Sequence, residues 1–522
     1  MENKTKKITK TAFLLIIVTM FAKVFGFLRE VVLGSFFGTS YKKDALLASQ
    51  LVPGVLFASI MASFSTTFIP LYNEISVREG KERSKKFVNN SISLIFFVAS
   101  IISIFGIIFS NQIVNITVAG FDLEKKVLTA NLLKITFVYI IFLGINYIFQ
   151  GYLQSNEKFI IPALTSLPFN AIIISSTFLA NKYDIYGVAV GYVLGYLSMV
   201  IFQLIFILKN GYKPKIKIDF LNDQYIKKMF KLIVPVFIGS SVMSLNSFVD
   251  KYLASHLQEG SISALDYADR LNGLVYGIFS SSIVTIMYPY LSRFFAGKQH
   301  DQFRKYLTMS INILIILMIP ISFGMFLLNK EIVEVVYQRG AFNQKSTILT
   351  AGALTFFSIG YLGYSIRDIL SRTFYSIQDT LTPMKNGIFA VFINIFLNII
   401  LVRFLQHKGL ALGTSIVSYI SVFLLLRSLR KKIGNLNIKN NIIVLLKSIF
   451  SASIMCIVIY LIKEYLPINS NYNFIIKSLL LGLYIIISFL IYSFTIYILN
   501  ITEVKWLVTN VKIKVKTLIY KS

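Results

Sequence analysis

The chain has 522 residues, of which 56% are hydrophobic and only 14% are charged, and its mean hydropathy is +0.71. Soluble domains carry about a quarter charged residues, so this composition excludes an ordinary soluble fold and indicates a polytopic membrane protein. The single cysteine, Cys456, excludes an intrachain disulfide and a cysteine-based metal cluster. The net charge of +29 would suit a nucleic-acid partner, but the positions of the basic residues indicate another cause.

Apolar runs of about 20 residues predict an all-α polytopic fold with 14 transmembrane helices. In chain order the predicted spans are 12–34, 46–71, 87–110, 127–152, 160–180, 185–208, 229–256, 263–291, 306–328, 347–375, 384–405, 409–428, 442–465 and 474–499. The first span leads directly into the others, so we expect no cleavable signal peptide.

Most of the basic residues fall on one predicted side of the membrane, in segments 1–10, 72–86, 209–231, 430–432 and 505–522. By the positive-inside rule, this side is the cytoplasm and holds both termini. The excess positive charge is thus a topology signal that also attracts anionic lipid headgroups. We therefore expect no nucleic-acid partner.

The first span contains the stretch FAKVFGFLREVVLG, which places Lys23, Arg29 and Glu30 inside an apolar helix. A charge at the bilayer centre costs about 2.5 to 3.5 kcal/mol on insertion scales. Lys23 and Glu30 share one helix face with Gly26, and Arg29 lies roughly 120° from Lys23. This side should face a water-filled cavity or a partner helix. The alternative is a structural ion pair of Lys23 with Glu30 or Asp44, which leaves Arg29 unexplained.

Short motifs recur along the chain at a nearly constant interval. GTSYKKD at 38–44 resembles GSISALD at 260–266, and GVAVG at 187–191 resembles GLALG at 409–413, with the same spacing between the two members of each pair. Glu157 and Asp379 repeat this spacing, and each is followed by a proline. The pattern predicts an internal duplication.

The duplication predicts two parallel six-helix repeats plus a C-terminal helix pair. The expected parts are an N-terminal lobe at 1–215, a C-terminal lobe at 225–432, two extra helices at 442–499 and a basic cytoplasmic tail at 500–522. Parallel repeats of this kind occur in secondary transporters, which bind substrate between the halves and work by alternating access.

Charges in the eighth span extend this prediction. The sequence LDYADRLNGL places Asp269 and Arg270 near the outer end of that span. Together with Lys23 and Arg29, Arg270 would line a cation-rich cavity, with Asp44 and Asp269 close by. Such a cavity suits an anionic substrate, because guanidinium groups bind phosphate oxygens in a bidentate manner.

Five other charged residues are expected to support or gate this cavity rather than to contact substrate. Glu30 and Asp269 lie beside the predicted cavity cations, and Glu157, Arg372 and Asp379 lie at the cytoplasmic ends of spans. Charges at helix ends are well placed to tie neighbouring helices together.

A second polar set contains one carboxylate and several neutral oxygens. Asn246 and Asp250 are four residues apart, as are Asn394 and Asn398, and Thr414 lies at a similar depth. Such a set is a candidate metal site for a hard cation such as Na⁺. The alternative is that these side chains only form hydrogen bonds between helices. We expect no cofactor other than this coupling ion.

Four ordered motifs resemble the lipid II flippases of the MurJ type, in the multidrug/oligosaccharidyl-lipid/polysaccharide exporter superfamily. They are the run from Thr19 to Ser49, YADRL at 267–271, YQRGAF at 337–342 and SRTFYSIQDTLTP at 371–383. The resemblance covers essentially the whole chain. It implies transport of undecaprenyl-diphosphate-linked muropeptide (lipid II) from the inner to the outer leaflet of the bacterial cytoplasmic membrane, for peptidoglycan biosynthesis. It also implies a lipid-tail groove beside the last two helices, contact with membrane lipids, and cell-wall synthesis proteins as partners.

Matched by position, the resemblance implies that Arg29, Asp44 and Arg270 are the essential substrate-binding charges. Lys23 stands where the family usually has arginine, which keeps the charge but loses the planar fork. The family commonly carries a further arginine near Phe57, and this chain has none there. The chain thus has one cavity cation fewer than that pattern.

Three other functions remain as alternatives. A flippase for another polyprenyl-linked glycan would look similar in sequence, whereas a cation-coupled drug antiporter of the same superfamily normally has twelve spans and an acidic cavity. A membrane enzyme would need catalytic carboxylates on a substantial outer loop, and the longest outer loops, near 111–126 and 329–346, carry no such pair with a basic partner. The sequence therefore favours a transporter over an enzyme.

Overall fold

The computed structural model describes residues 2–216, 220, 222–434, 436, 438–469 and 472–505. These residues form helices joined mostly by short turns, with no strand among them. The predicted all-α fold is therefore confirmed. The chain divides into two compact units, Met1–Ser263 with Arg339–Asn343, and Ala264–Gln338 with Gln344–Ser522.

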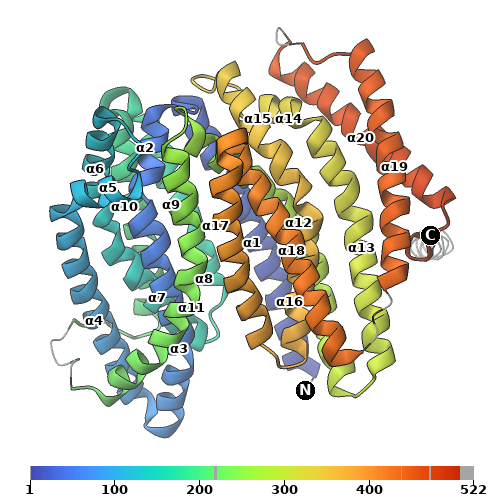
Figure 1. Ribbon diagram of the computed structural model, residues 1–522. Helices are drawn as coiled ribbons and strands as arrows, with labels where there is room; N and C mark the ends of the chain where they lie inside the picture. Colours follow the sequence, from blue (N-terminus) through green and yellow to red (C-terminus); the bar gives the residue numbers. More distant parts are fainter. Residues whose placement is uncertain are drawn as a thin grey trace, which may run out of the picture. The chain divides into compact units, whose positions relative to one another are not determined.

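Most helices of the first unit follow one another with short connections, and a longer linker joins α10 to α11 (Figure 1). The helices of this unit are α1 (Glu2–Phe37), α2 (Tyr41–Ser49), a π-helical turn (Leu51–Leu56), α3 (Phe57–Arg78), α4 (Gly80–Ile108), α5 (Ser110–Thr117), α6 (Leu123–Phe137), α7 (Tyr139–Ser155), α8 (Ile160–Leu164), α9 (Ser166–Phe178), α10 (Ala180–Lys209) and α11 (Gln224–Ser255).

The second unit takes up the chain within the first turn of α12. Its helices are α12 (Ser261–Ala296), α13 (His300–Leu327), α14 (Asn329–Tyr337), α15 (Gln344–Ile359), α16 (Tyr361–Ser376), α17 (Leu381–Leu405), α18 (His407–Ile433), α19 (Ile438–Tyr465) and α20 (Phe474–Ile498).

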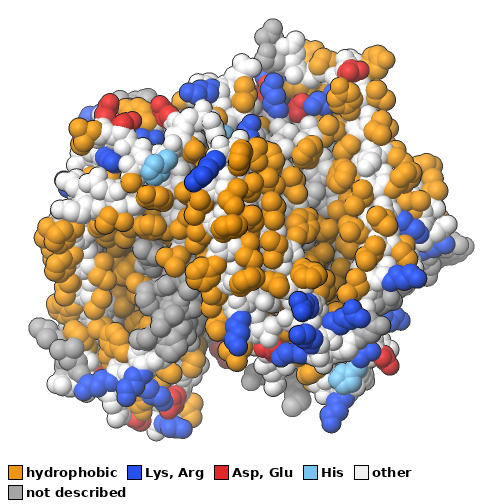
Figure 2. Space-filling view, in the orientation of Figure 1, with side chains coloured by type: hydrophobic (Ala, Val, Ile, Leu, Met, Phe, Trp, Pro, Cys, Tyr) orange, Lys and Arg blue, Asp and Glu red, His pale blue; other side chains and the backbone are white. Residues whose placement is uncertain are grey.

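Eleven helices of the described residues are long and apolar enough to cross a membrane, or twelve if the bent pair α15–α16 is one span. This confirms a polytopic membrane protein. Helices α1 and α11 occupy the predicted spans 12–34 and 229–256, and the count of 14 stays a prediction. In the second unit, Figure 2 shows apolar side chains over the middle of the helices and basic side chains gathered toward their ends.

Four helices begin where the sequence supplies a capping side chain. The side chains of Ser40, Asp122, Asp223 and Asn473 accept hydrogen bonds from backbone N–H groups in the first turns of α2, α6, α11 and α20. Each cap satisfies a donor that the helix itself leaves unpaired, so these boundaries follow from local chemistry.

Two breaks in the helices also have local causes. The π-helical turn contains Pro53 and Gly54, and proline has no N–H for the regular bond to the preceding turn. The second break lies at Gly360, where α15 and α16 meet at an angle of 46°. Each break lies inside a predicted span, and the span at 347–375 is bent at Gly360.

In the first unit, α1 packs on α8 and α9, α7 packs on α3, α4 and α10, and α11 packs on α3, α4 and α5. Helix α11 thus belongs to the first unit, whereas the sequence assigned residues from 225 onward to the second lobe. Apolar periodicity does not reveal which neighbour a membrane helix contacts. The lobe boundaries stay a prediction.

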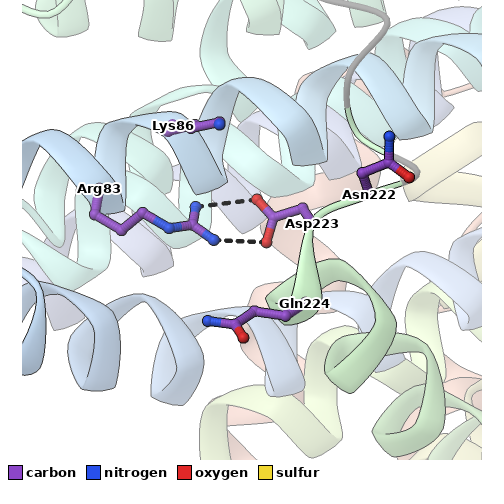
Figure 3. A pocket seen from close by; sticks show the side chains of 5 residues that line it. All are labelled: Arg83, Lys86, Asn222, Asp223 and Gln224. Carbon is purple, nitrogen blue, oxygen red and sulfur yellow. Dashed lines mark hydrogen bonds and ion pairs between the residues drawn. The ribbon is translucent and has the colours of Figure 1, made fainter.

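The start of α11 is fixed to α4 by a bidentate ion pair (Figure 3). Arg83 Nη1 and Nη2 lie 3.0 and 2.8 Å from the carboxylate oxygens of Asp223, and Asn90 donates a further hydrogen bond of 2.7 Å. Burial alone would raise the pKa of Asp223, but hydrogen bonds from Arg83, the Tyr225 N–H and Asn90 lower it overall. The cavity beside this pair measures about 270 Å³ and is lined by Arg83, Lys86, Asn222, Asp223 and Gln224.

The preceding linker is held by the same helix. The Asn89 side-chain oxygen accepts hydrogen bonds from the Tyr212 hydroxyl at 2.7 Å and from the Lys215 N–H at 2.8 Å. Adjacent residues of α4 therefore fix the linker at both of its ends.

In the second unit, the C-terminal helices α19 and α20 are attached at both ends. At one end, Lys477 lies 2.7 Å from Glu334 and Lys463 lies 2.6 Å from Glu331, both of α14. Apolar contacts around Leu328 and Tyr484 surround these pairs.

At the other end, amide groups connect α13, α19 and the segment after α20. Asn441 donates to the side-chain oxygen of Asn312 at 2.7 Å, and Asn312 donates to Glu503 at 2.6 Å. The pair α19–α20 is therefore an integral part of the second unit.

We expect Lys477→Met to lower the free energy of unfolding by about 2 kcal/mol, because Glu334 is only 8% exposed and loses its cation. Unfolding in SDS-containing mixed micelles would measure this loss. Lys463→Met is the matched control, since that lysine is more exposed and its loss should matter less. A smaller effect for Lys477 than for Lys463 would contradict this account.

Left-handed backbone positions recur at the interval found in the motifs. Gly38 and Gly260 both have positive φ, as do Asp184 and Gln406, and both pairs have the same spacing along the chain as the repeated motifs. Asp184 and Gln406 share even the same φ of 52°. Non-glycine residues rarely adopt this conformation, so the recurrence supports the predicted repeat.

Candidate functional site

Arg29 of α1 is anchored on α9 and α10 within the first unit. Its Nη1 donates a hydrogen bond of 3.0 Å to the side-chain oxygen of Asn170, and its guanidinium lies 5.6 Å from the ring centre of Phe169 and 5.9 Å from that of Tyr192. Such aromatic faces attract a cation. Gly26, one turn earlier, packs against the same Asn170, so a close approach between α1 and α9 positions the arginine.

Glu30 joins Arg29 to α2. One carboxylate oxygen accepts from Arg29 Nη2 at 2.5 Å and from its Nε at 3.1 Å, and the other lies 3.2 Å from Lys43 Nζ. The side chains of Glu30 and Lys43 are 2% and 0% exposed. Since buried charges require partners, this group is a single electrostatic unit.

Asp44 is the next residue of α2 and connects α2 to α6 and to the start of α12. Its carboxylate lies 2.9 Å from Lys125 Nζ and accepts hydrogen bonds from the Gly260 and Ser263 N–H groups and from the Ser263 hydroxyl. Because these donors occupy both oxygens, the observed contacts of Asp44 are structural. Its predicted contact with substrate stays a prediction.

Lys23 lies two turns before Arg29 and is exposed. It forms no ion pair with a residue whose side chain the structure describes, and Glu30 pairs with Arg29 and Lys43 instead. An exposed lysine on an apolar helix is available to a ligand or to lipid headgroups.

Arg270 and Asp269 lie in α12 of the second unit. Arg270 is 47% exposed and its Nη2 lies 3.4 Å from Asp266, one turn earlier. Asp269 is also exposed and accepts a weak hydrogen bond of 3.4 Å from Asn272. The predicted charges thus fall in two groups, one in each unit.

Three predicted end charges have different surroundings. Arg372 is exposed and lies 3.9 Å from Asp368, whereas Asp379 lies 2.5 Å from Lys432 and also accepts two hydrogen bonds from Thr382. Asp379 therefore ties the start of α17 to the end of α18, as a supporting residue would. Glu157 is exposed, with a left-handed φ of 61°.

Asp379 should make stability depend on acid pH. Burial alone would raise the pKa of its carboxyl, but Lys432 and Thr382 lower it to about 2. A depressed pKa stabilises the fold above about pH 4 and loses that contribution as pH falls toward 2. Asp379→Asn should lower the free energy of unfolding by about 1 kcal/mol at pH 7 and flatten its acid dependence. Unfolding curves at pH 7 and pH 3 test this; equal losses at both pH values would contradict it.

The residues of the predicted cation site are also divided between the units. Asn246 and Asp250 lie on α11 of the first unit, whereas Asn394 and Asn398 on α17 and Thr414 on α18 belong to the second. Asn398 donates to Asn394 at 2.9 Å, and the Thr414 hydroxyl donates to a backbone carbonyl of its own helix. These two hydrogen bonds lie within single helices, and both the cation site and the alternative of hydrogen bonds between helices stay predictions.

Several site residues were not singled out from the sequence. Lys125 and Asn170 are far from their partners in sequence, by 81 and 141 residues, whereas Lys43 lies 13 residues from Glu30. The only local signal was the polar motif GTSYKKD, which contains Lys43.

The fold is similar to that of a known membrane transporter. A multidrug resistance MATE family transporter of the MOP superfamily, solved in an inward-facing conformation, matches with a TM-score of 0.67 and 13% identity, over 82% of this chain and 99% of that chain. This likeness shows the fold alone. The protein therefore has a transporter-like helical fold, with charged side chains inside its apolar helices.

The family is defined by sequence. The model of the family Lipid II flippase MurJ matches residues 33–501, so the chain belongs to the lipid II flippase MurJ family. A probable lipid II flippase MurJ of Rickettsia prowazekii (strain Madrid E) is 32% identical over 506 residues, covering 95% of this chain and 98% of the relative. The corresponding protein of Buchnera aphidicola subsp. Schizaphis graminum (strain Sg) is 31% identical over 498 residues, covering 93% and 95%.

A solved structure supports the same assignment. It is described as lipid II flippase MurJ in an inward closed conformation, and it matches with a TM-score of 0.79 at 30% identity, over 93% of this chain and 98% of that chain. The resemblance stated from the motifs is thereby confirmed, as is the expectation of a transporter rather than an enzyme.

Proposed function

We propose that this protein moves undecaprenyl-diphosphate-linked muropeptide from the inner to the outer leaflet by alternating access, and that Arg29, Lys23 and Arg270 bind the diphosphate headgroup. The observation that carries the proposal is the anchored Arg29, a guanidinium held in α1 by Asn170 of α9 and by Glu30, which in turn pairs with Lys43 of α2. A fixed planar fork matches the oxygens of a phosphate. Family membership supplies the substrate class.

Each cation has a distinct part in this proposal. Arg29 is held in place and would orient the bound phosphate. Lys23 is exposed and adds positive charge. Arg270 in α12 is half exposed and lies next to Asp266. A phosphate would displace the weak Arg270–Asp266 contact of 3.4 Å. Asp44 supports the site by fixing the start of α12.

The proposed scaffold has 14 transmembrane helices in two parallel repeats of six, followed by the C-terminal pair. The recurrent left-handed positions and the two additional helices α1 and α11 support it. The pair α19–α20 would offer a groove for the polyprenyl tail, since α20 is almost wholly apolar and largely exposed.

The protein acts in the bacterial inner membrane, as a multi-pass member of its family. We place both termini in the cytoplasm because of the basic segments near them. Cell-wall synthesis proteins, which would consume the flipped lipid, are its proposed partners.

Na⁺ is the proposed coupling ion, at Asn246, Asp250, Asn394, Asn398 and Thr414. The carboxylate and amide oxygens are the ligands that a hard cation prefers. Transport in proteoliposomes with an imposed Na⁺ gradient tests this, with K⁺ as the control cation. Equal rates with both would contradict Na⁺ coupling.

The test of the function itself is lipid II exposure in the outer leaflet of cells depleted of their own flippase. Cells that produce this protein should regain exposure, and cells with an empty vector should not. Abundance in the membrane is measured in parallel by immunoblotting. Absence of exposure at normal abundance would overturn the proposal and favour another polyprenyl-linked glycan as substrate.

A further inference from the structure

One carboxylate serves two cations in the first unit. Glu30 places one oxygen against Arg29 and the other against Lys43, at 2.5 and 3.2 Å. Lys43 is entirely buried, so it reaches no ligand in bulk solvent and acts through Glu30. Lys43 follows another lysine in a polar motif, so the sequence did not identify it as a site residue.

The charges of these three side chains sum to one positive charge. The neighbouring ion pair of Asp44 and Lys125 adds no net charge. Attraction between charges is strong where water is excluded. The way in which the Glu30 carboxylate is shared between Arg29 and Lys43 therefore determines how much positive charge Arg29 keeps. If Glu30 faced Arg29 alone, the two would form a neutral pair, and a phosphate would have to compete with that carboxylate for the guanidinium.

We infer that Lys43 is a positioning residue for the anion site at Arg29. By holding one oxygen of Glu30, it draws that carboxylate away from full neutralisation of Arg29 and leaves the guanidinium able to bind a phosphate. Glu30 orients Arg29, and Lys43 offsets the negative charge of Glu30. The inference rests on the proposed function, because it names a residue that tunes the same headgroup site.

This charge balance is distinguishable from a purely structural need for Lys43. Methionine has a similar length without the charge, so Lys43→Met retains much of the packing. If Lys43 acts by offsetting the Glu30 charge, then removing that charge as well, in Glu30→Gln/Lys43→Met, restores the net positive charge at Arg29. A structural need for the lysine predicts that the double variant is no better than the single one.

The experiment measures equilibrium binding of radiolabelled lipid II to the purified full-length protein in detergent micelles. Lys43→Met should weaken binding about ten- to a hundredfold, and Lys43→Arg, which keeps the cation, should bind within about threefold of the unmodified protein. The double variant should return to within about threefold of Glu30→Gln alone. Thermal unfolding of each variant shows whether it is folded.

Two outcomes overturn the inference: unchanged binding by Lys43→Met, or a double variant as weak as the single one. Should Lys43→Met fail to fold, the comparison of Glu30→Gln with the double variant still decides, because a residue that acts only through the Glu30 charge has no effect on binding once that charge is gone. Arg29→Ala is measured alongside. Normal binding by Arg29→Ala would reject the headgroup site itself, a failure distinct from that of the Lys43 inference.

Discussion

Arg29→Ala is expected to abolish lipid II translocation, reducing the rate by at least about a hundredfold. The substitution removes the guanidinium that α1 presents and leaves Glu30 with Lys43 as its described cation, so the site changes from a net positive to a neutral one. Loss of a hydrogen-bonded charge partner costs about 2 to 5 kcal/mol, which accounts for a loss of this size. Outer-leaflet exposure of lipid II in flippase-depleted cells measures it.

Two control variants separate the role of the Arg29 guanidinium from that of its charge and from the loss of any exposed arginine. Arg29→Lys keeps the charge but not the planar fork, so it should retain intermediate activity. Arg403→Ala removes an exposed arginine of α17 outside the site and should transport normally. If Arg29→Ala flips lipid II at the normal rate with normal abundance, Arg29 does not bind the headgroup.

Asp44→Ala should have the largest effect on stability, lowering the free energy of unfolding by about 3 to 5 kcal/mol. The carboxylate is buried, and its removal leaves Lys125 without this partner and the Gly260 and Ser263 N–H groups without their acceptor. Each buried polar group that loses its partner adds its own desolvation penalty. Unfolding in SDS-containing mixed micelles measures the loss.

Asp122→Ala is the matched control for Asp44→Ala. Asp122 also accepts a backbone hydrogen bond at a helix start, from the Lys125 N–H at 2.8 Å, so its loss should cost only about 1 kcal/mol. In the variant Asp44→Asn/Lys125→Met, no buried charge lacks its partner, and part of the stability should return. Equal losses for Asp44→Ala and Asp122→Ala would show that the buried ion pair contributes little.

Part of the fold could be predicted because its causes are local. Apolar length identifies the helices, and capping side chains such as Ser40 and Asp223 mark where some begin. The interval between the repeated motifs reappears in the backbone at Asp184 and Gln406. The membership of α11 in the first unit was not predictable, since every face of a membrane helix is apolar enough to contact either a neighbour or lipid.

The site was predictable only in part, for the same reason. The charges of Lys23, Arg29 and Glu30 are conspicuous in an apolar run, whereas Lys43 follows another lysine in what looks like a polar turn. Its burial arises from the packing of α2 on α6 and α10, a tertiary event. The partner that the sequence offered for Glu30 was Lys23, and helical spacing alone could not exclude it.

The attachment of α19 and α20 at both ends bears on how this protein meets the bilayer. A free helix pair adapts to a thinner or thicker membrane by tilting, but this pair is fixed to α14 through Glu331 and Glu334 and to α13 through Asn312. A tilt of the pair therefore strains α13 and α14 as well. Mismatch with the lipid chains is thus carried into the second unit rather than absorbed by the helix pair alone.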